Sequence, residues 1–145
     1  MLIEALQNLL STDPGMQGFL GTSSSRKDST NGIFPTQAIE QPNMPYVVLS
    51  QVSGVPLQTS MAGTGRLMSE RWRFEFCGTT YKSAKKFAKY GQSFLLGVFG
   101  ANTAGNCWIQ GAWKKLEADT KENLGKGTMY STHIDVEFEY IDYDN

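Results

Sequence analysis

The chain has 145 residues, a formal net charge of −1 and a hydrophobic content of 40%, which together suit one globular domain and exclude a fully disordered chain. The near-neutral charge gives no general attraction to nucleic acid or to an anionic membrane surface. No apolar run approaches the roughly 20 residues that span a bilayer, and the first ten residues do not resemble a signal peptide. We therefore expect a protein that is made and used in the cytoplasm, or in a particle assembled there.

The N-terminal third is predicted to hold one helix, a long loop and two strands. Apolar residues at helical spacing between Leu2 and Leu10 predict a helix that ends at Asp13-Pro14-Gly15, with a partial further turn over Met16–Leu20. Small polar residues without periodicity predict a mobile loop over Gly21–Gly32. A short edge strand begins at Ile33, and Tyr46–Ser53 is predicted as a central strand because apolar residues lie on both of its faces.

The rest of the chain is organised around a strand over Arg66–Gly78 that runs into a helix over Thr80–Val98. In the strand, aromatic residues alternate with charged ones, which indicates a half-buried strand. The helix has an apolar stripe and an opposite face of lysines, Lys82, Lys85, Lys86 and Lys89. We expect the aromatic face and the apolar stripe to pack against each other. The lysines are interpreted as a solvated face in preference to a phosphate-binding one.

The C-terminal third is predicted to hold two more strands. A turn over Gly97–Asn106 leads into a strand over Cys107–Glu117, and a charged turn over Ala118–Gly127 leads into the last strand, Thr128–Asp142, which has strict alternation. The predicted order is α-β-β-β-α-β-β. This order indicates an α+β fold with a mostly antiparallel sheet, an N-terminal helix and one longer helix packed on it. A single domain covers residues 1–145, with long loops at 21–32 and 54–65.

Candidate residues for catalysis or metal binding are few. The cysteines Cys77 and Cys107 stand thirty residues apart and, with the single histidine, supply no recognisable set of metal ligands. That histidine, His133, falls among carboxylates on the polar face of the last strand, where a solvated, salt-linked role is expected. No nucleophile elbow, phosphate loop or dinucleotide fingerprint is present. We therefore expect no metal, no cofactor and no enzymatic activity.

Two other patterns favour a binding or assembly protein. Both predicted loops exceed the roughly 4–6 residues that usually connect elements in compact domains, and loops of such length are commonly functional or disordered. Arg71 and Arg73 are expected opposite Glu137 and Glu139, a favourable cross-strand pairing. The same charges suit a contact across a subunit boundary equally well, and the sequence does not separate the two arrangements.

Several motifs resemble those of the tail-completion proteins (tail-terminator or head–tail joining proteins) of long-tailed bacteriophages and prophages. They are an N-terminal helix ending in a turn, the stretch Pro42-Asn43-Met44-Pro45-Tyr46-Val47-Val48, the strand end Trp72-Arg73-Phe74-Glu75-Phe76 and the helix start Thr79-Thr80-Tyr81. The resemblance covers the chain from Leu2 to about Tyr140, and its motifs are structural rather than catalytic. Residues 21–32 and 97–106 match nothing in the family pattern.

The resemblance implies a structural virion protein that caps the tail tube and joins the tail to the head. Six copies would form a ring at the head–tail interface of the virion, after assembly in the host cytoplasm. Its partners would be other copies, the tail tube protein and head connector or neck proteins, while DNA passes through the lumen without specific binding and no membrane is involved. The expected contacts with tube or connector are Arg26, Lys27, Met61 and Thr64 in the two loops. The expected subunit interface comprises Arg71, Arg73, Glu137 and Glu139.

Two alternatives remain open at this point. The chain is also compatible with another neck or head-closure subunit, or with a tail-tube subunit, which differ in what they contact rather than in chemistry. The second alternative is a small enzyme or ligand-binding α+β domain, with Trp72, Trp108 and Trp113 lining a pocket between helix and sheet.

Overall fold

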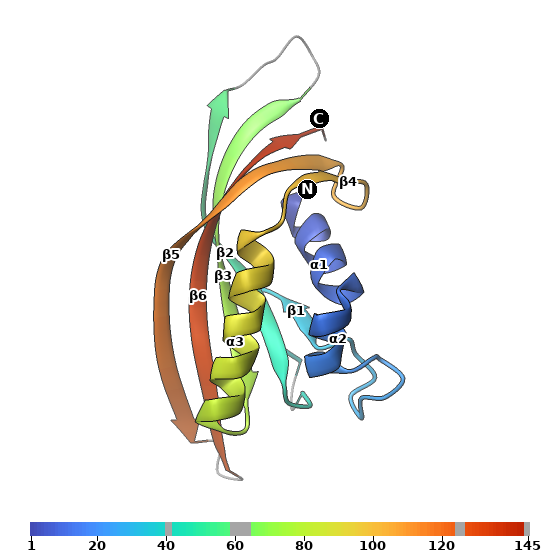
Figure 1. The fold of residues 1–145 in the computed structure, drawn as a ribbon, viewed down its shortest axis with the longest axis vertical. Coiled ribbons are helices and arrows are strands. Elements are labelled where there is room, and N and C mark those ends of the chain that lie inside the picture. Colours follow the sequence, from blue (N-terminus) through green and yellow to red (C-terminus); the bar gives the residue numbers. More distant parts are fainter. Residues whose placement is uncertain (40–41, 59–64, 124–126, 144–145) are drawn as a thin grey trace.

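A computed structural model of the chain describes residues 1–39, 42–58, 65–123 and 127–143. The helices and strands are drawn in Figure 1. In chain order they are α1 (Leu2–Thr12), α2 (Pro14–Leu20), β1 (Ile33–Pro35), β2 (Tyr46–Gln58), β3 (Arg66–Gly78), α3 (Tyr81–Leu96), β4 (Gly100–Asn102), β5 (Cys107–Asn123) and β6 (Thr128–Asp142). The α+β class and the positions of the two main helices are as predicted.

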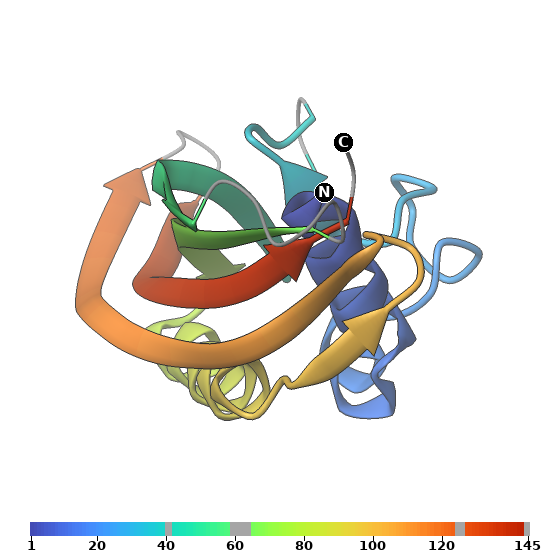
Figure 2. The same ribbon diagram turned by 90° about the horizontal axis from the view of Figure 1, so that it is seen from above.

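The strands form one curled sheet in the order β1-β2-β3-β6-β5-β4, with β5 sweeping around β6 (Figure 2). The β1 and β2 strands pair in parallel, whereas the other neighbours pair antiparallel. The sheet is therefore mixed, and the prediction of a mostly antiparallel sheet is wrong. The difference lies in the short β1, which runs in the same direction as β2 where an antiparallel neighbour was expected.

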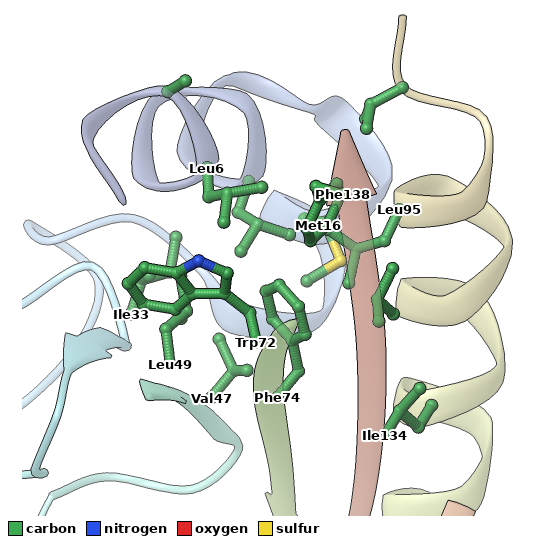
Figure 3. Packing of buried hydrophobic residues seen from close by; sticks show 14 of the residues in the cluster. Leu6, Met16, Ile33, Val47, Leu49, Trp72, Phe74, Leu95, Ile134 and Phe138 are labelled. Carbon is green, nitrogen blue, oxygen red and sulfur yellow. The ribbon is translucent and has the colours of Figure 1, made fainter. Parts of the chain in front are cut away.

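One face of the sheet packs against the helices and forms the main core (Figure 3). Trp72 and Phe74 of β3, with Ile134 and Phe138 of β6, are at most 4% exposed, and they pack with Leu6 of α1 and Leu95 of α3. The packing of the aromatic strand face against the apolar helix stripe is confirmed. The face turned away from the helices, called the outer face below, carries the charged residues that alternate with these core residues.

Side-chain caps fix where the helices begin. The Asp13 side chain accepts a hydrogen bond from the backbone N–H of Met16 at 3.0 Å, which caps α2 in the manner favoured by aspartate. The Tyr90 hydroxyl of α3 donates to the same carboxylate at 2.6 Å and so ties the two helices together. With Pro14 in its first turn, α2 is a full helix, where the sequence predicted only a partial turn over Met16–Leu20.

Three segments that were predicted as turns or loops belong to strands. The β5 strand continues to Asn123, which pairs with Thr128, so 118–123 extends a hairpin where a charged turn was expected. The β2 strand continues to Gln58 and takes in the first five residues of the loop predicted at 54–65. The short β4 lies in the turn predicted over 97–106. Pro56 is compatible with β2 because that part of the strand has an unpaired edge.

A first prediction concerns Gly91, where α3 lies close to β3. A β-carbon added at Gly91 would stand 2.4 Å from the Phe76 ring, which is itself fully buried. Although alanine gains about 1 kcal/mol of helix propensity over glycine, overpacking a rigid core typically costs about 1–3 kcal/mol. We expect Gly91→Ala to lower the free energy of unfolding in a urea titration. Gly18→Ala in α2, where no atom lies within 4 Å of the added carbon, is the matched control and should be neutral or stabilising.

Candidate interaction surface

The charged part of the outer face is built by two central strands. In the β3–β6 register Arg71 lies opposite Glu137, and Arg73 lies opposite Asp135. Alternation along each strand points these side chains away from the helices, because their neighbours Trp72 and Val136 fill the core. Arg71 thus faces Glu137 as predicted, whereas Arg73 faces Asp135 and the predicted partner Glu139 lies opposite Ser69.

Asp135 is the centre of this charged group. Asp135 is 0% exposed, and its carboxylate accepts hydrogen bonds from Arg71 Nη2 at 2.9 Å and from Arg73 Nε at 2.8 Å. Burial by itself raises the pKa of Asp135, but the hydrogen bonds and charges of the two arginines outweigh burial, and the pKa lies below its ordinary value. The side chains of Arg71 and Arg73 are 36% and 39% exposed, so both cover the carboxylate while meeting solvent.

The two predicted acidic interface residues differ in their surroundings. Glu137 accepts a hydrogen bond from Ser69 Oγ at 2.7 Å, and its other oxygen lies 3.1 Å from Lys115 Nζ. The Ser69 hydrogen bond and Lys115 lower the pKa of Glu137 below its ordinary value. The Glu139 backbone pairs in the sheet, but its side chain makes no hydrogen bond or ion pair with any other residue that the structure describes. The assignment of these residues to a subunit interface stays a prediction, and Glu139 is the acidic residue whose charge is left available for it.

The loop over 21–32 is held together by a buried ion pair. Arg26 and Asp28 have side chains only 4% and 5% exposed, and they join through two hydrogen bonds of 3.0 and 2.9 Å. The Arg26 guanidinium also donates to the carbonyl oxygens of Leu20, Pro45 and Asn43, which fastens the loop to the start of β2. Arg26 is thus an internal anchor, and Lys27 is the exposed cation of the loop. The predicted contacts Met61 and Thr64 lie outside the described residues.

Both sides of the sheet have strand edges that the short outer strands leave uncovered. Among the described residues, β1 pairs with β2 only over Val47–Leu49, and β4 pairs with β5 only over Cys107–Ile109. The remaining segments, 50–58 of β2 and 110–122 of β5, are called the free edges below. Each carries exposed apolar side chains, Val52, Val55 and Leu57 on β2 and Trp113 and Leu116 on β5. The β2 edge was hard to predict from the sequence, because Gly54 and Pro56 are typical of loops.

The polar cluster around His133 lacks the geometry of a catalytic triad. Its Nε2 atom lies 3.7 Å from Glu75 Oε1, 3.3 Å from Thr120 Oγ1 and 3.4 Å from Ser131 Oγ. A triad needs the carboxylate on one ring nitrogen and the nucleophile on the other, whereas here all three groups approach the same nitrogen. His133 lies beside the Glu75 carboxylate, in the polar surroundings expected from the sequence, and its salt-linked role stays a prediction.

The described parts of the chain offer little support for a metal site, a membrane-spanning helix or a tryptophan-lined pocket. No group of three or more His, Cys, Asp or Glu side chains gathers there as a metal site. Both cysteines are buried free thiols. The described helices include none that is long and apolar enough to cross a membrane. Trp72 is buried in the core, whereas Trp113 stands on the outer face beside Glu137, so these tryptophans do not line one common pocket.

Comparisons with known proteins inform the fold. No family model matches the chain, and no curated protein matches it either. Among solved structures, it is similar to a chain described as "Virion of native gene transfer agent (GTA) particle", with a TM-score of 0.62 and 14% sequence identity. The match covers 94% of this chain and 92% of the other. At this identity the likeness shows a shared fold over almost the full length of both chains.

Proposed function

We propose that the protein is a structural subunit of a phage-like virion, and that it completes the tail as a homohexameric ring between tail tube and head connector. The observation that carries the proposal is the full-length fold similarity to a chain of a gene transfer agent virion. The sequence motifs narrow the role to tail completion, because they resemble that family. Two of them occupy structural positions here: Tyr46 opens β2, and Thr80 caps α3 by accepting from the Ser83 backbone N–H at 3.0 Å.

The shape of the molecule supports a joining role. A protein between tail and head needs contacts toward two different partners. β2 ends and β3 begins at one end of the long axis in Figure 1, whereas β5 ends and β6 begins at the opposite end. We assign one end of the ring to the tail tube and the other to the head connector, with DNA passing through the lumen without specific binding. The contacts within this proposal are Lys27, Met61 and Thr64 toward partners and Glu139 between subunits.

Particles assembled without this gene test the role directly. A tail-completion protein predicts full heads beside unjoined tails of abnormal length in electron micrographs. Empty, leaking heads would instead indicate a head-closure subunit, and the absence of tails would indicate a tube subunit. Normal joined particles would contradict all three structural roles and would favour the alternative of a ligand-binding α+β domain.

A second prediction tests the partner role of Lys27. Because Lys27 is exposed and has no charge partner among the described residues, Lys27→Glu should leave the free energy of unfolding within about 0.5 kcal/mol. We expect about tenfold weaker binding to isolated tubes or connectors, since reversing a charge at a contact costs roughly 1–2 kcal/mol. Lys86→Glu, an exposed lysine on α3, is the matched control. Equal binding by both variants and wild type would remove Lys27 from the contact.

A further inference from the structure

The two free edges lie on opposite sides of the same sheet, and each presents unpaired backbone groups. Strand edges of this kind are templates for pairing with another chain, and soluble proteins usually cover or shorten them. Here the free segments are long: 50–58 on β2 and 110–122 on β5 have a neighbouring strand on one side only, among the described residues. Every residue from Gln51 to Leu57 and from Trp113 to Asn123 is exposed.

The directions of the two strands suit one another. From β2 through β3 and β6 to β5 each neighbour is antiparallel, so β5 runs opposite to β2. When copies are repeated around an axis roughly along the strands, β5 of one copy therefore meets β2 of the next in antiparallel orientation. A contact between two different surfaces of the same chain is heterologous, and it closes into a ring when the rotation returns to the first copy.

The side chains on the two edges also match in character. Val55 on β2 and Leu116 on β5 are 55% and 40% exposed, and the register places both on the outer face, opposite Ser69 and Asp135 respectively. Apolar side chains of this size on an uncovered strand edge are unusual for a monomer. Lys114 and Lys115, which flank Leu116, pair with Glu117 and Glu137 of their own chain, so the charges next to Leu116 are compensated.

We infer that copies of this chain join by antiparallel pairing of the β2 free edge of one subunit with the β5 free edge of the next. This inference rests on the proposed ring. The regular stretch of β5 begins at Leu116, after a bulge, and runs to Asn123. The β2 contact centres on Ser53–Val55, between a second bulge and Pro56, which lacks a backbone donor. The second copy thereby continues the sheet and covers both apolar edges.

Engineered disulfides test the pairing. Val55, Leu116, Ala118 and Thr120 all lie on the outer face, so V55C/L116C, V55C/A118C and V55C/T120C sample three antiparallel registers. A disulfide needs Cα atoms within about 7 Å, so we expect one of the three to give a ladder from dimer to closed multimer on oxidation. The V55C, L116C, A118C and T120C single variants should stop at dimers. The native thiols Cys77 and Cys107 are buried and should contribute little background.

An assembly measurement separates failure of this interface from failure of the ring itself. Light scattering of wild-type protein, alone and with tail tubes, should give a ring-sized mass, and V55D/L57D should reduce the assembled fraction at least tenfold. Ile39→Asp, at another exposed apolar residue, should assemble normally. If wild type forms rings while no ladder appears and V55D/L57D still assembles, the edge pairing is overturned and the proposed function stands. A wild-type protein that stays monomeric in every mixture overturns both.

Discussion

Replacing Arg71 and Arg73 together with alanine is expected to cost about 3 kcal/mol of unfolding free energy, because Asp135 loses the hydrogen bonds that both arginines donate to its carboxylate, and water that reaches the uncovered carboxylate compensates only in part. Each single replacement should cost only about 1 kcal/mol or less, since the second arginine still pairs with the carboxylate and each arginine is more than a third exposed. The double variant should therefore be clearly worse than the sum of the singles. Urea unfolding of the three variants measures this difference.

A triple variant separates the buried charge from lost packing. Adding Asp135→Asn to the double arginine variant removes the unpaired charge and should recover much of the lost stability. If the triple variant is as unstable as the double, the loss comes from the arginine stems and not from the carboxylate. Equal costs for the double variant and for the sum of its singles would contradict the shared role of the two arginines.

The lowered pKa of Asp135 predicts that the free energy of unfolding depends on pH. The pKa of Asp135 is lower in the folded chain than the roughly 3.9 of an unperturbed aspartate, so the unfolded chain binds its proton more tightly. The stabilisation is fully present above that unfolded pKa and is lost as the pH falls below it toward the folded pKa. We expect the stability difference between wild type and Asp135→Asn to shrink between pH 5 and pH 3.

The elements with strong periodicity were predictable from the sequence. Trp72, Phe74 and Phe76 alternate with charged residues on β3, and both β3 and the helix that follows lie where the alternation and the helical stripe placed them. Here local pattern and tertiary packing favour the same structure. The outer-face pairing was also foreseeable in kind, because opposite charges at cross-strand positions attract.

Strand segments without an apolar face were not predicted from the sequence. Residues 118–123 of β5 are exposed on both faces, so they have no hydrophobic alternation from which a strand could be recognised. They are held instead by pairing with β6 and by ion pairs such as that of Asp119 with Lys85, at 2.8 Å. Lys85 lowers the pKa of Asp119, which shows that this pairing favours the ionised carboxylate. Such contacts join residues distant in sequence and leave no local signature.

The burial of charged residues was also not predictable from the sequence. Arg26 and Asp135 both occupy positions that composition and alternation assign to solvent. Each is buried because a partner of opposite charge and several hydrogen bonds compensate for lost hydration. The spacing of Arg26, Asp28 and Thr30 offered one usable signal: Asp28 accepts from the Thr30 backbone N–H at 3.1 Å, a local turn that aspartate commonly forms.

Replacing Arg26 with alanine is the second large expected effect, at about 3–5 kcal/mol of unfolding free energy. The substitution leaves the Asp28 carboxylate buried without its cation and removes a donor from the carbonyl oxygens of Leu20 and Pro45. Hydrogen bonding to Arg26 holds the pKa of Asp28 well below its usual range, so the carboxylate stays ionised near neutral pH. Lys27→Ala, one residue along the same loop, should change stability by no more than about 0.5 kcal/mol.

A double variant distinguishes the buried pair from a general loss of loop packing. Arg26→Ala combined with Asp28→Ala should be less destabilising than the sum of the single substitutions, because the second change removes the charge stranded by the first. Arg26→Lys should fall between wild type and Arg26→Ala, since an ammonium group keeps the charge but not the forked contact with both carboxylate oxygens. Urea unfolding measures stability, and trypsin cleavage after Lys27, a site that all these variants keep, reports loop opening. Unchanged cleavage in Arg26→Ala would show that the loop is held by other contacts, and the exposed cation Lys27 would then be presented to partners by a loop that does not depend on its anchor.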